Sequence, residues 1–141
     1  PQPFVTQALA QDAEIEVALD MTEEWDKATD GASGLTMGCV VVRTEFAQQN
    51  KEALDLFLDE YERSVQTVTS AEGLEHAAQL AEQYNIVKAP VARKAIPACN
   101  IVFVQGEQMQ QIAGGFLEVL YQANPKSVGG KLPDANFYYN R

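Results

Sequence analysis

The sequence predicts an α/β fold in which a few short strands are covered by a larger number of helices. The first observation is the apolar run LTMGCVVVR at residues 35–43, which has no polar face and is typical of a strand buried on both sides. The second is the recurrence of apolar residues every three or four positions from 51 to 68, which predicts a helix packed on one face. A chain of 141 residues is large enough to bury a core of its own.

The N-terminal part is predicted to contain a helix, a strand and a second helix. The opening PQPFVTQALA is interpreted as the exit of a strand followed by a short helix, with Pro3 in its first turn. Acidic and apolar residues alternate in EIEVALD, which predicts a half-exposed strand at 14–19. Thr22 is positioned to cap a short acidic helix around 23–27.

After residue 43 the pattern is mostly helical. Helices are predicted at 45–49, 51–68, 70–84, 88–95 and 107–123. Asn50 is the expected cap of the longest helix, and Asn85 is a suitable left-handed stop after the one at 70–84. The run NIVFV at 100–104 fits a strand or an extended loop.

Two glycines and an aromatic tail mark the C-terminal part. Gly114 and Gly115, in the middle of the last helix, indicate either a kink or close approach by another backbone, and close packing is favoured. Phe137, Tyr138 and Tyr139 are expected to hold the irregular tail against the body of the protein. The inventory of only three strand candidates indicates a piece of a larger α/β protein, and a chain that begins with Pro1 indicates processing or trimming.

The charge and motif content exclude several classes of function. The net charge is −10, and most of the acidic residues lie in the first 62 positions, which argues against nucleic-acid binding. There is no phosphate-binding loop, no GxSxG and no cluster of metal ligands, and His76 is interpreted as merely packed or exposed. The expectation is a non-catalytic protein without a cofactor.

The two cysteines leave two alternatives open. Cys39 and Cys99 lie far apart in the sequence and form no CxxC motif, and a single histidine does not complete a zinc site with them. They are either buried thiols or, if the protein is exported, the two halves of one disulfide.

Three stretches of the chain carry a family resemblance. These are PQPFVTQAL, the run from EWDKATDGASG through CVVVRTEF to DEYERSV, and KAIPACNIVFVQGEQ through NPKSVGGKLPDANFYY. Together they resemble the C-terminal part of ABC-transporter substrate-binding proteins, closest to the group similar to binders of thiamine precursors, sulfonates and nitrate. The segments IPACN and NPKSVGGKLPD make this resemblance more specific than the apolar strand and helix alone.

The resemblance implies a partial type II periplasmic-binding-protein-like fold with two α/β lobes and a cleft that closes on ligand. Residues 1–36 would be the end of the second lobe, residues 37–43 the hinge or crossover strand, and residues 44–141 the C-terminal part of the first lobe with the tail. The protein would be extracytoplasmic, periplasmic or anchored as a lipoprotein in its parent form. Its partners would be a small-molecule ligand and an ABC permease in the membrane, and unpaired strand edges would make the fragment homodimeric or domain-swapped.

Ligand-binding residues are expected at two places. Ligands of open α/β sheets bind at the carboxyl ends of strands, so Gln2 and Phe4 would supply a polar and a stacking contact. Thr36, Met37 and Gly38 lie at the predicted crossover, where a glycine lets the backbone approach the ligand. Similar proteins often carry an acidic residue where Gln2 stands, so this substitution weakens the expectation of a cationic ligand.

The leading hypothesis is therefore a solute-binding component of an ABC importer that captures a small polar or heteroaromatic molecule. One alternative is an enzyme similar to the thiamine-pyrimidine synthase that shares the fold, although Cys39 and Cys99 offer too few catalytic groups. Another is the effector-sensing domain of a transcription regulator, which the tail NPKSVGGKLPD fits poorly.

Overall fold

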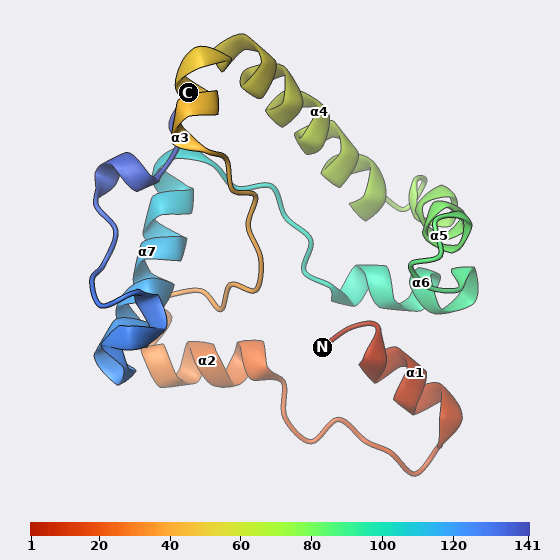
Figure 1. Cartoon of the computed structure of the whole chain (residues 1–141). Helices are drawn as coiled ribbons and strands as arrows, with labels where there is room; N and C mark the ends of the chain where they lie inside the picture. Colours follow the sequence, from red (N-terminus) through yellow and green to blue (C-terminus); the bar gives the residue numbers. More distant parts are fainter. The chain divides into compact units, whose positions relative to one another are not determined.

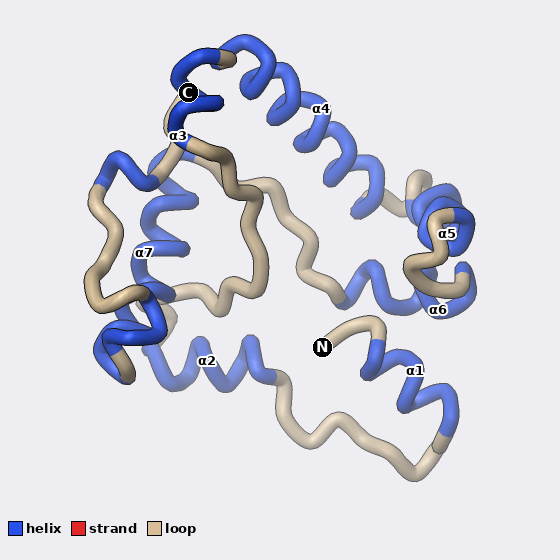
Figure 2. Tube along the Cα trace, viewed as in Figure 1, coloured by secondary structure: helices blue, strands red, loops and turns tan.

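The computed structural model describes residues 1–141 and consists of helices joined by irregular segments (Figures 1 and 2). The α-helices are α1 (Phe4–Gln11), α2 (Met21–Thr29), α3 (Thr44–Gln49), α4 (Lys51–Thr69), α5 (Leu74–Gln83), α6 (Ala89–Ala95) and α7 (Gly106–Ala123). Short 3-10 helices follow at η1 (Ile96–Ala98), η2 (Pro125–Val128) and η3 (Ala135–Phe137). Each helix predicted from the sequence is present, with bounds that differ by a few residues.

The predicted α/β class is wrong for this chain. Helices make up 62% of the residues and no strand is formed, so the sheet of a type II periplasmic-binding-protein-like fold is absent. Residues 14–19, 37–43 and 100–104 are all irregular backbone, drawn as loop in Figure 2. A strand exists through hydrogen bonds to a neighbouring strand, and no backbone hydrogen bond joins these segments to a distant part of the chain. Their sequence patterns are those of strands, but a pattern does not supply a pairing partner.

The chain divides into two compact units, which are described separately. Unit 1 comprises Pro1–Glu16 and Thr44–Phe103, and unit 2 comprises Val17–Arg43 and Val104–Arg141. The chain passes from unit 2 to unit 1 between residues 43 and 44, which is where the segment expected to be a crossover strand ends. The units group the residues differently from the predicted lobes, whose assignment in a two-lobed parent stays a prediction.

Unit 1 is organised by the pairing of α5 with α6. Small side chains form this contact, because Ala78 of α5 and Ala92 and Ala95 of α6 are buried. Methyl side chains let the two helix backbones approach closely, while larger side chains such as Leu80 and Val91 are half-buried. The pairing therefore depends on shape and on polar ties at its edges.

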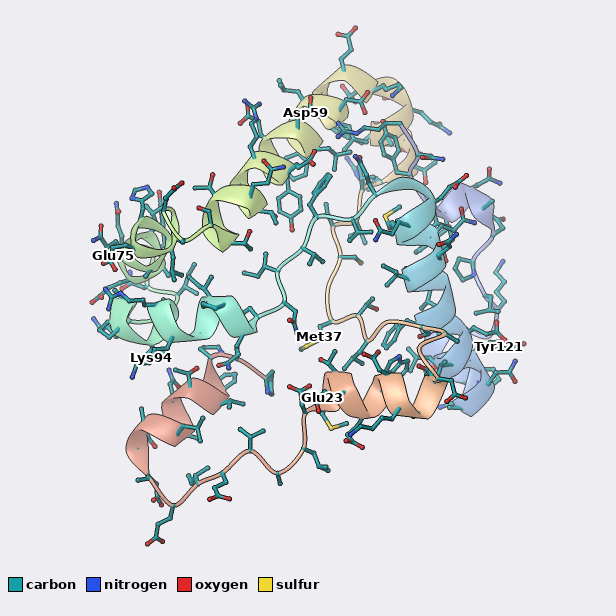
Figure 3. The ribbon with its side chains drawn as sticks, turned by 180° about the vertical axis from the view of Figure 1, so that it is seen from behind. Glu23, Met37, Asp59, Glu75, Lys94 and Tyr121 are labelled. Carbon is teal, nitrogen blue, oxygen red and sulfur yellow. The ribbon has the colours of Figure 1, made fainter.

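Two carboxylates of α5 provide those ties. Glu75 accepts two hydrogen bonds from Arg93, at 2.6 Å from Nε and 2.8 Å from Nη2, and Figure 3 labels Glu75 at the α5–α6 end of the unit. Glu82 accepts from the Ala89 backbone N–H at 2.9 Å and from Lys88 Nζ at 3.0 Å, which caps the start of α6. The side chain of Arg93 lowers the pKa of Glu75, and the Ala89 N–H followed by Lys88 lowers the pKa of Glu82.

The longest helix, α4, buries less than its apolar stripe predicts. Leu54 and Val65 are buried, but Phe57 and Tyr61 are exposed and stack on each other with ring centroids 5.9 Å apart. The rings of Tyr61 and Phe103 meet in a T-shaped arrangement at the same centroid distance. The prediction of a helix is confirmed, whereas the prediction that its whole stripe packs in a core is wrong.

Unit 2 is built where α2 and the loop after it meet α7. Trp25 donates its indole N–H to the Ser33 carbonyl at 3.0 Å, and its ring lies 5.2 Å from that of Phe116. A Cβ placed on Gly115 would come within 3.2 Å of the Ser33 Cβ, so the loop lies directly on the glycine. This confirms close backbone packing as the reason for a glycine at 115, whereas Gly114 faces the tail.

Helix ends follow local side-chain chemistry. Asp20, and not the predicted Thr22, caps α2 by accepting from the N–H groups of Thr22 at 2.8 Å and Glu23 at 3.3 Å. Asn85 adopts a left-handed φ of 56° after α5, as predicted. Asn50 precedes α4 but its side chain makes no capping bond, and its Nδ2 donates to the Phe46 carbonyl instead. None of the helices is both long and apolar enough to cross a membrane.

Candidate ligand-binding hollow

A hollow of about 200 Å³ lies within unit 2, between α7 and the C-terminal tail. Its lining combines two positions of α7 with five of the tail: Gln110, Gly114, Leu132, Pro133, Asp134, Ala135 and Tyr138. We refer to this feature as the α7–tail hollow. Because all of its lining belongs to one unit, its shape follows from local packing alone.

The tail returns along α7, and this path creates the hollow. It leaves α7 through η2, which packs against the helix, and the Arg141 Nε at its end donates to Gln105 Oε1 at 2.7 Å beside the start of the helix. The segment in between is fixed by Asp134, whose Oδ1 accepts from the Asn136 N–H at 2.9 Å and starts η3. The tail therefore forms a wall with a defined backbone.

Small side chains on α7 bring Tyr138 close to the helix. A Cβ on Gly114 would lie 3.6 Å from the Tyr138 hydroxyl, which is ordinary contact. Tyr138 is half-buried and meets Phe137 edge-on at a centroid distance of 5.3 Å, while Phe137 itself is exposed. The expectation that Phe137 anchors the tail is wrong, because the half-buried rings are those of Tyr138 and Tyr139.

The polar groups of the hollow favour ligands that donate hydrogen bonds. Asp134 contributes a carboxylate, of which one oxygen is used by Asn136, and Gln110 and Tyr138 contribute an amide and a phenol. No lysine or arginine lines the hollow. The ring of Tyr138 and the apolar side chains of Leu132 and Pro133 complete the lining.

The predicted contacts Gln2 and Phe4 lie in unit 1 and do not line the hollow. The Gln2 Oε1 accepts from the Thr6 hydroxyl at 2.7 Å and from the Thr6 N–H at 3.3 Å, so the side chain stabilises the first turn of α1. Phe4 is the first residue of α1 and is 67% exposed. The structure thus gives Gln2 a helix-capping role.

The predicted contacts Thr36, Met37 and Gly38 lie in the irregular segment of unit 2, outside the hollow. Met37, labelled in Figure 3, is 83% exposed, and Thr36 is half-buried. A Cβ on Gly38 would meet nothing within 4 Å, so no close approach requires a glycine there. Their role as ligand contacts stays a prediction.

Both cysteines are free and exposed, and they belong to different units. Neither of the arrangements expected from the sequence, buried thiols or a disulfide, is formed. The Cys99 Sγ donates to the Ala95 carbonyl at 3.2 Å, and partial burial raises the pKa of this thiol. Cys39 lies in the irregular segment between α2 and α3.

A second, shallower depression of about 530 Å³ lies in unit 1, where α4 ends and α5 begins. Its lining is mostly exposed and polar: Arg63, Gln66, Thr67, Ser70, Glu72, Gly73 and His76. Arg63 is already paired with Glu60 at 2.6 Å, and His76 is exposed, one of the two placements expected for it. The buried Gly73 is required by the turn, because a Cβ there would collide with the Thr67 carbonyl.

The sequence alone does not single out the hollow residues Gln110, Asp134 and Tyr138. A usable signal is present for Asp134 and Tyr138, because they lie in the segment NPKSVGGKLPDANFYY, which carries part of the family resemblance. The pattern of the tail nevertheless predicts only an anchored terminus. Its return along α7 depends on contacts that no local pattern encodes.

Comparison with known proteins yields no significant match, whether with family models, with curated proteins or with solved structures. No group of three or more side chains suited to holding a metal ion is found in the structure.

Proposed function

We propose that this chain belongs to the solute-binding component of an ABC importer and contributes to the capture of a small polar or heteroaromatic molecule. The observation that carries the proposal is the α7–tail hollow, which lies on the segment NPKSVGGKLPDANFYY that resembles substrate-binding proteins. The acceptor-rich lining and the Tyr138 ring suit a flat molecule with hydrogen-bond donors.

The proposed role is capture and delivery without chemical change of the ligand. One carboxylate oxygen of Asp134 already accepts a hydrogen bond from the Asn136 N–H. No nucleophile paired with a base lines the hollow. The partner that would receive the ligand is a membrane permease, and the setting is extracytoplasmic. Both follow from the sequence resemblance.

The charge of the hollow ranks the three ligand classes that the resemblance implies. Nitrate and sulfonates are anions and would approach the Asp134 carboxylate without a basic side chain to bind them. An aminopyrimidine of the thiamine-precursor type has ring amino groups that donate hydrogen bonds and a flat face for Tyr138. We therefore expect aminopyrimidines to bind more tightly than either anion.

Isothermal titration calorimetry tests this proposal with an aminopyrimidine, an alkanesulfonate and nitrate as probes. A ligand present at about 100 times its Kd should add about 2.7 kcal/mol to the unfolding free energy, which a thermal-shift assay would register. Asp134→Asn should weaken binding about tenfold, whereas Glu118→Gln, on an exposed part of α7 outside the hollow, should not. Release of a chemically altered product from any probe, or equal affinity in all variants, would overturn the proposal.

A further inference from the structure

Two irregular segments of the chain combine exposed apolar side chains with unpaired backbone. In residues 14–20, EIEVALD, the side chains of Val17 and Leu19 are 60% and 65% exposed. In residues 37–43, MGCVVVR, Val41 is 78% exposed and its neighbours Val40 and Val42 are also exposed. Both sequences have the composition of strands, and β-branched residues favour extended backbone.

The backbone groups of these segments are available for pairing. Residues 37–43 make no backbone hydrogen bond, and in residues 14–20 only the first two amides are used, because the Glu14 and Ile15 N–H groups bond to Asp12. At the other end, the Asp20 carbonyl accepts from Glu24 at the start of α2. The backbone N–H groups from Glu16 to Asp20 are therefore free to donate hydrogen bonds. Such an unpaired edge is a template for another strand.

One antiparallel register makes the two segments complementary. When Val17 stands opposite Val40, Ile15 stands opposite Val42 and Leu19 opposite Gly38, so one face of the pair is entirely apolar. On the other face, Ala18 stands opposite Cys39. A shift by one residue in either direction would turn Arg43 to the face of Ile15, Val17 and Leu19. It would also turn Val40 and Val42 to the face of Glu14 and Glu16, so the pattern favours this alignment.

The same register satisfies the charges. Arg43 forms no ion pair in the structure, and the register places it opposite Glu14 and diagonal to Glu16, which are also unpaired. Pairing of the acidic segment with its own copy, centred on Val17, would instead place Glu14 opposite Asp20, two like charges. Charge therefore selects the pairing of 14–20 with 37–43 over self-pairing of 14–20.

We propose that a second copy of this chain supplies the complementary strand. The two segments remain unpaired within one chain, although both are exposed. In a two-fold dimer, residues 14–20 of each copy pair with residues 37–43 of the other, so the same contact is made twice. This assembly is independent of the ligand and of the α7–tail hollow, and it accounts for the strand-like sequences that the isolated chain leaves uncovered.

A charge-swap experiment tests the proposal with the full chain by sedimentation velocity. Wild type should dimerise with increasing concentration, and Arg43→Glu should raise the dimer Kd at least about tenfold, as should the double variant Glu14→Lys/Glu16→Lys. An equal mixture of the two variants should restore the dimer, because each interface of the mixed pair again joins opposite charges. Far-UV circular dichroism checks that each variant keeps its helices.

Three outcomes would overturn the proposal. Wild type could sediment as a monomer at every concentration, or dimerise with a Kd that none of these variants changes. In the third outcome, mixing the two variants fails to restore the dimer, whereas a chain that carries Arg43→Glu, Glu14→Lys and Glu16→Lys together shows wild-type hydrogen exchange. This result would show that the two segments pair within one chain.

Disulfide trapping provides an independent readout of the register. In a Cys99→Ser background, Ala18→Cys should form a disulfide with Cys39 of the other copy when copper phenanthroline and oxygen accept the two electrons and two protons. The expected product is a covalent dimer on a non-reducing gel. Val17→Cys in the same background is the matched control, since position 17 faces the other side of the ladder and should give little of this product. A fast-migrating cross-linked monomer, or equal cross-linking at 17 and 18, would contradict the proposed register.

Discussion

Trp25 donates its indole N–H to the carbonyl oxygen of Ser33 at 3.0 Å and lies 3.2 Å from the Ser33 hydroxyl oxygen. Ser33 is the one buried polar residue of the chain, and the loop that carries it lies on α7. This contact ties α2 to the loop after it and presents both to the helix that forms one wall of the hollow.

Replacement of Trp25 by phenylalanine should destabilise unit 2. The Trp25→Phe variant would keep an aromatic ring near Phe116 but leave the Ser33 carbonyl with only the longer bond from the Thr29 hydroxyl, at 3.4 Å, at a cost of about 1–3 kcal/mol. Because Trp25 is the only tryptophan, urea unfolding should be followed by circular dichroism. Phe137→Leu, at an exposed ring, should change the unfolding free energy by less than about 0.5 kcal/mol. Equal effects of the two substitutions would argue against a structural role for the indole N–H.

Alanine at the two adjacent glycines of α7 should have opposite effects. Gly114→Ala gains about 1 kcal/mol of helix propensity and adds a methyl group at ordinary contact distance from Tyr138. Gly115→Ala places its methyl group 3.2 Å from the Ser33 Cβ, so it should displace the loop and lower stability. Thermal unfolding of the two variants side by side measures this, and stabilisation by both would show that the loop yields easily.

The pairing of α5 with α6 should weaken in acid. The folded-state pKa values of Glu75 and Glu82 are lowered below the ordinary value of 4.5, so their stabilising effect is complete above that pH and is lost as the pH falls through the lowered values. Amide hydrogen exchange of α6, measured from roughly pH 6 to roughly pH 3 and corrected for intrinsic rates, should show falling protection. In the Glu75→Gln/Glu82→Gln variant the protection should start lower and change less with pH. An unchanged pH profile in that variant would assign the acid sensitivity to other groups.

Substitutions of Gln2 distinguish a helix-capping role of this side chain from a ligand contact. Gln2→Ala removes the acceptor for Thr6, so the first turn of α1 should fray and its amide protection should fall, by about 0.5–2 kcal/mol for a lost cap. Gln2→Glu keeps an oxygen acceptor and should preserve that protection. If Gln2→Ala reduced ligand affinity while leaving α1 protection unchanged, the capping role would be wrong.

The sequence was informative about helices because their determinants are local. The apolar spacing of 51–68 anticipates α4, and Asn85 ends α5 with the left-handed φ expected of an asparagine. The sequence also predicts the tight contact at Gly115, because a glycine inside a helix lowers its stability and indicates a position where a side chain would not fit. The extent of burial could not be inferred, because Phe57 lies on the predicted stripe and is nevertheless exposed.

The strands and the hollow depended on information that is not local. Val40 and its neighbours have the composition of a buried strand, but a ladder needs a partner that composition does not identify. The hollow arises because Asp134 and Tyr138 return to α7 in the tail. The ligand contact expected of Gln2 stays a prediction, and a position after a supposed strand gives no indication of its bond to Thr6, which depends on the helix that follows.

The distribution of the free thiols gives the chain two natural labelling sites of unequal reactivity. Cys39 belongs to unit 2 and Cys99 to unit 1, and the raised pKa of Cys99 together with its bond to Ala95 slows its reaction with maleimides at neutral pH. A first reagent should therefore modify mainly Cys39, and a second reagent should then modify Cys99. A donor and an acceptor dye attached in that order would report the distance between the two labelled positions by energy transfer, without any engineered cysteine.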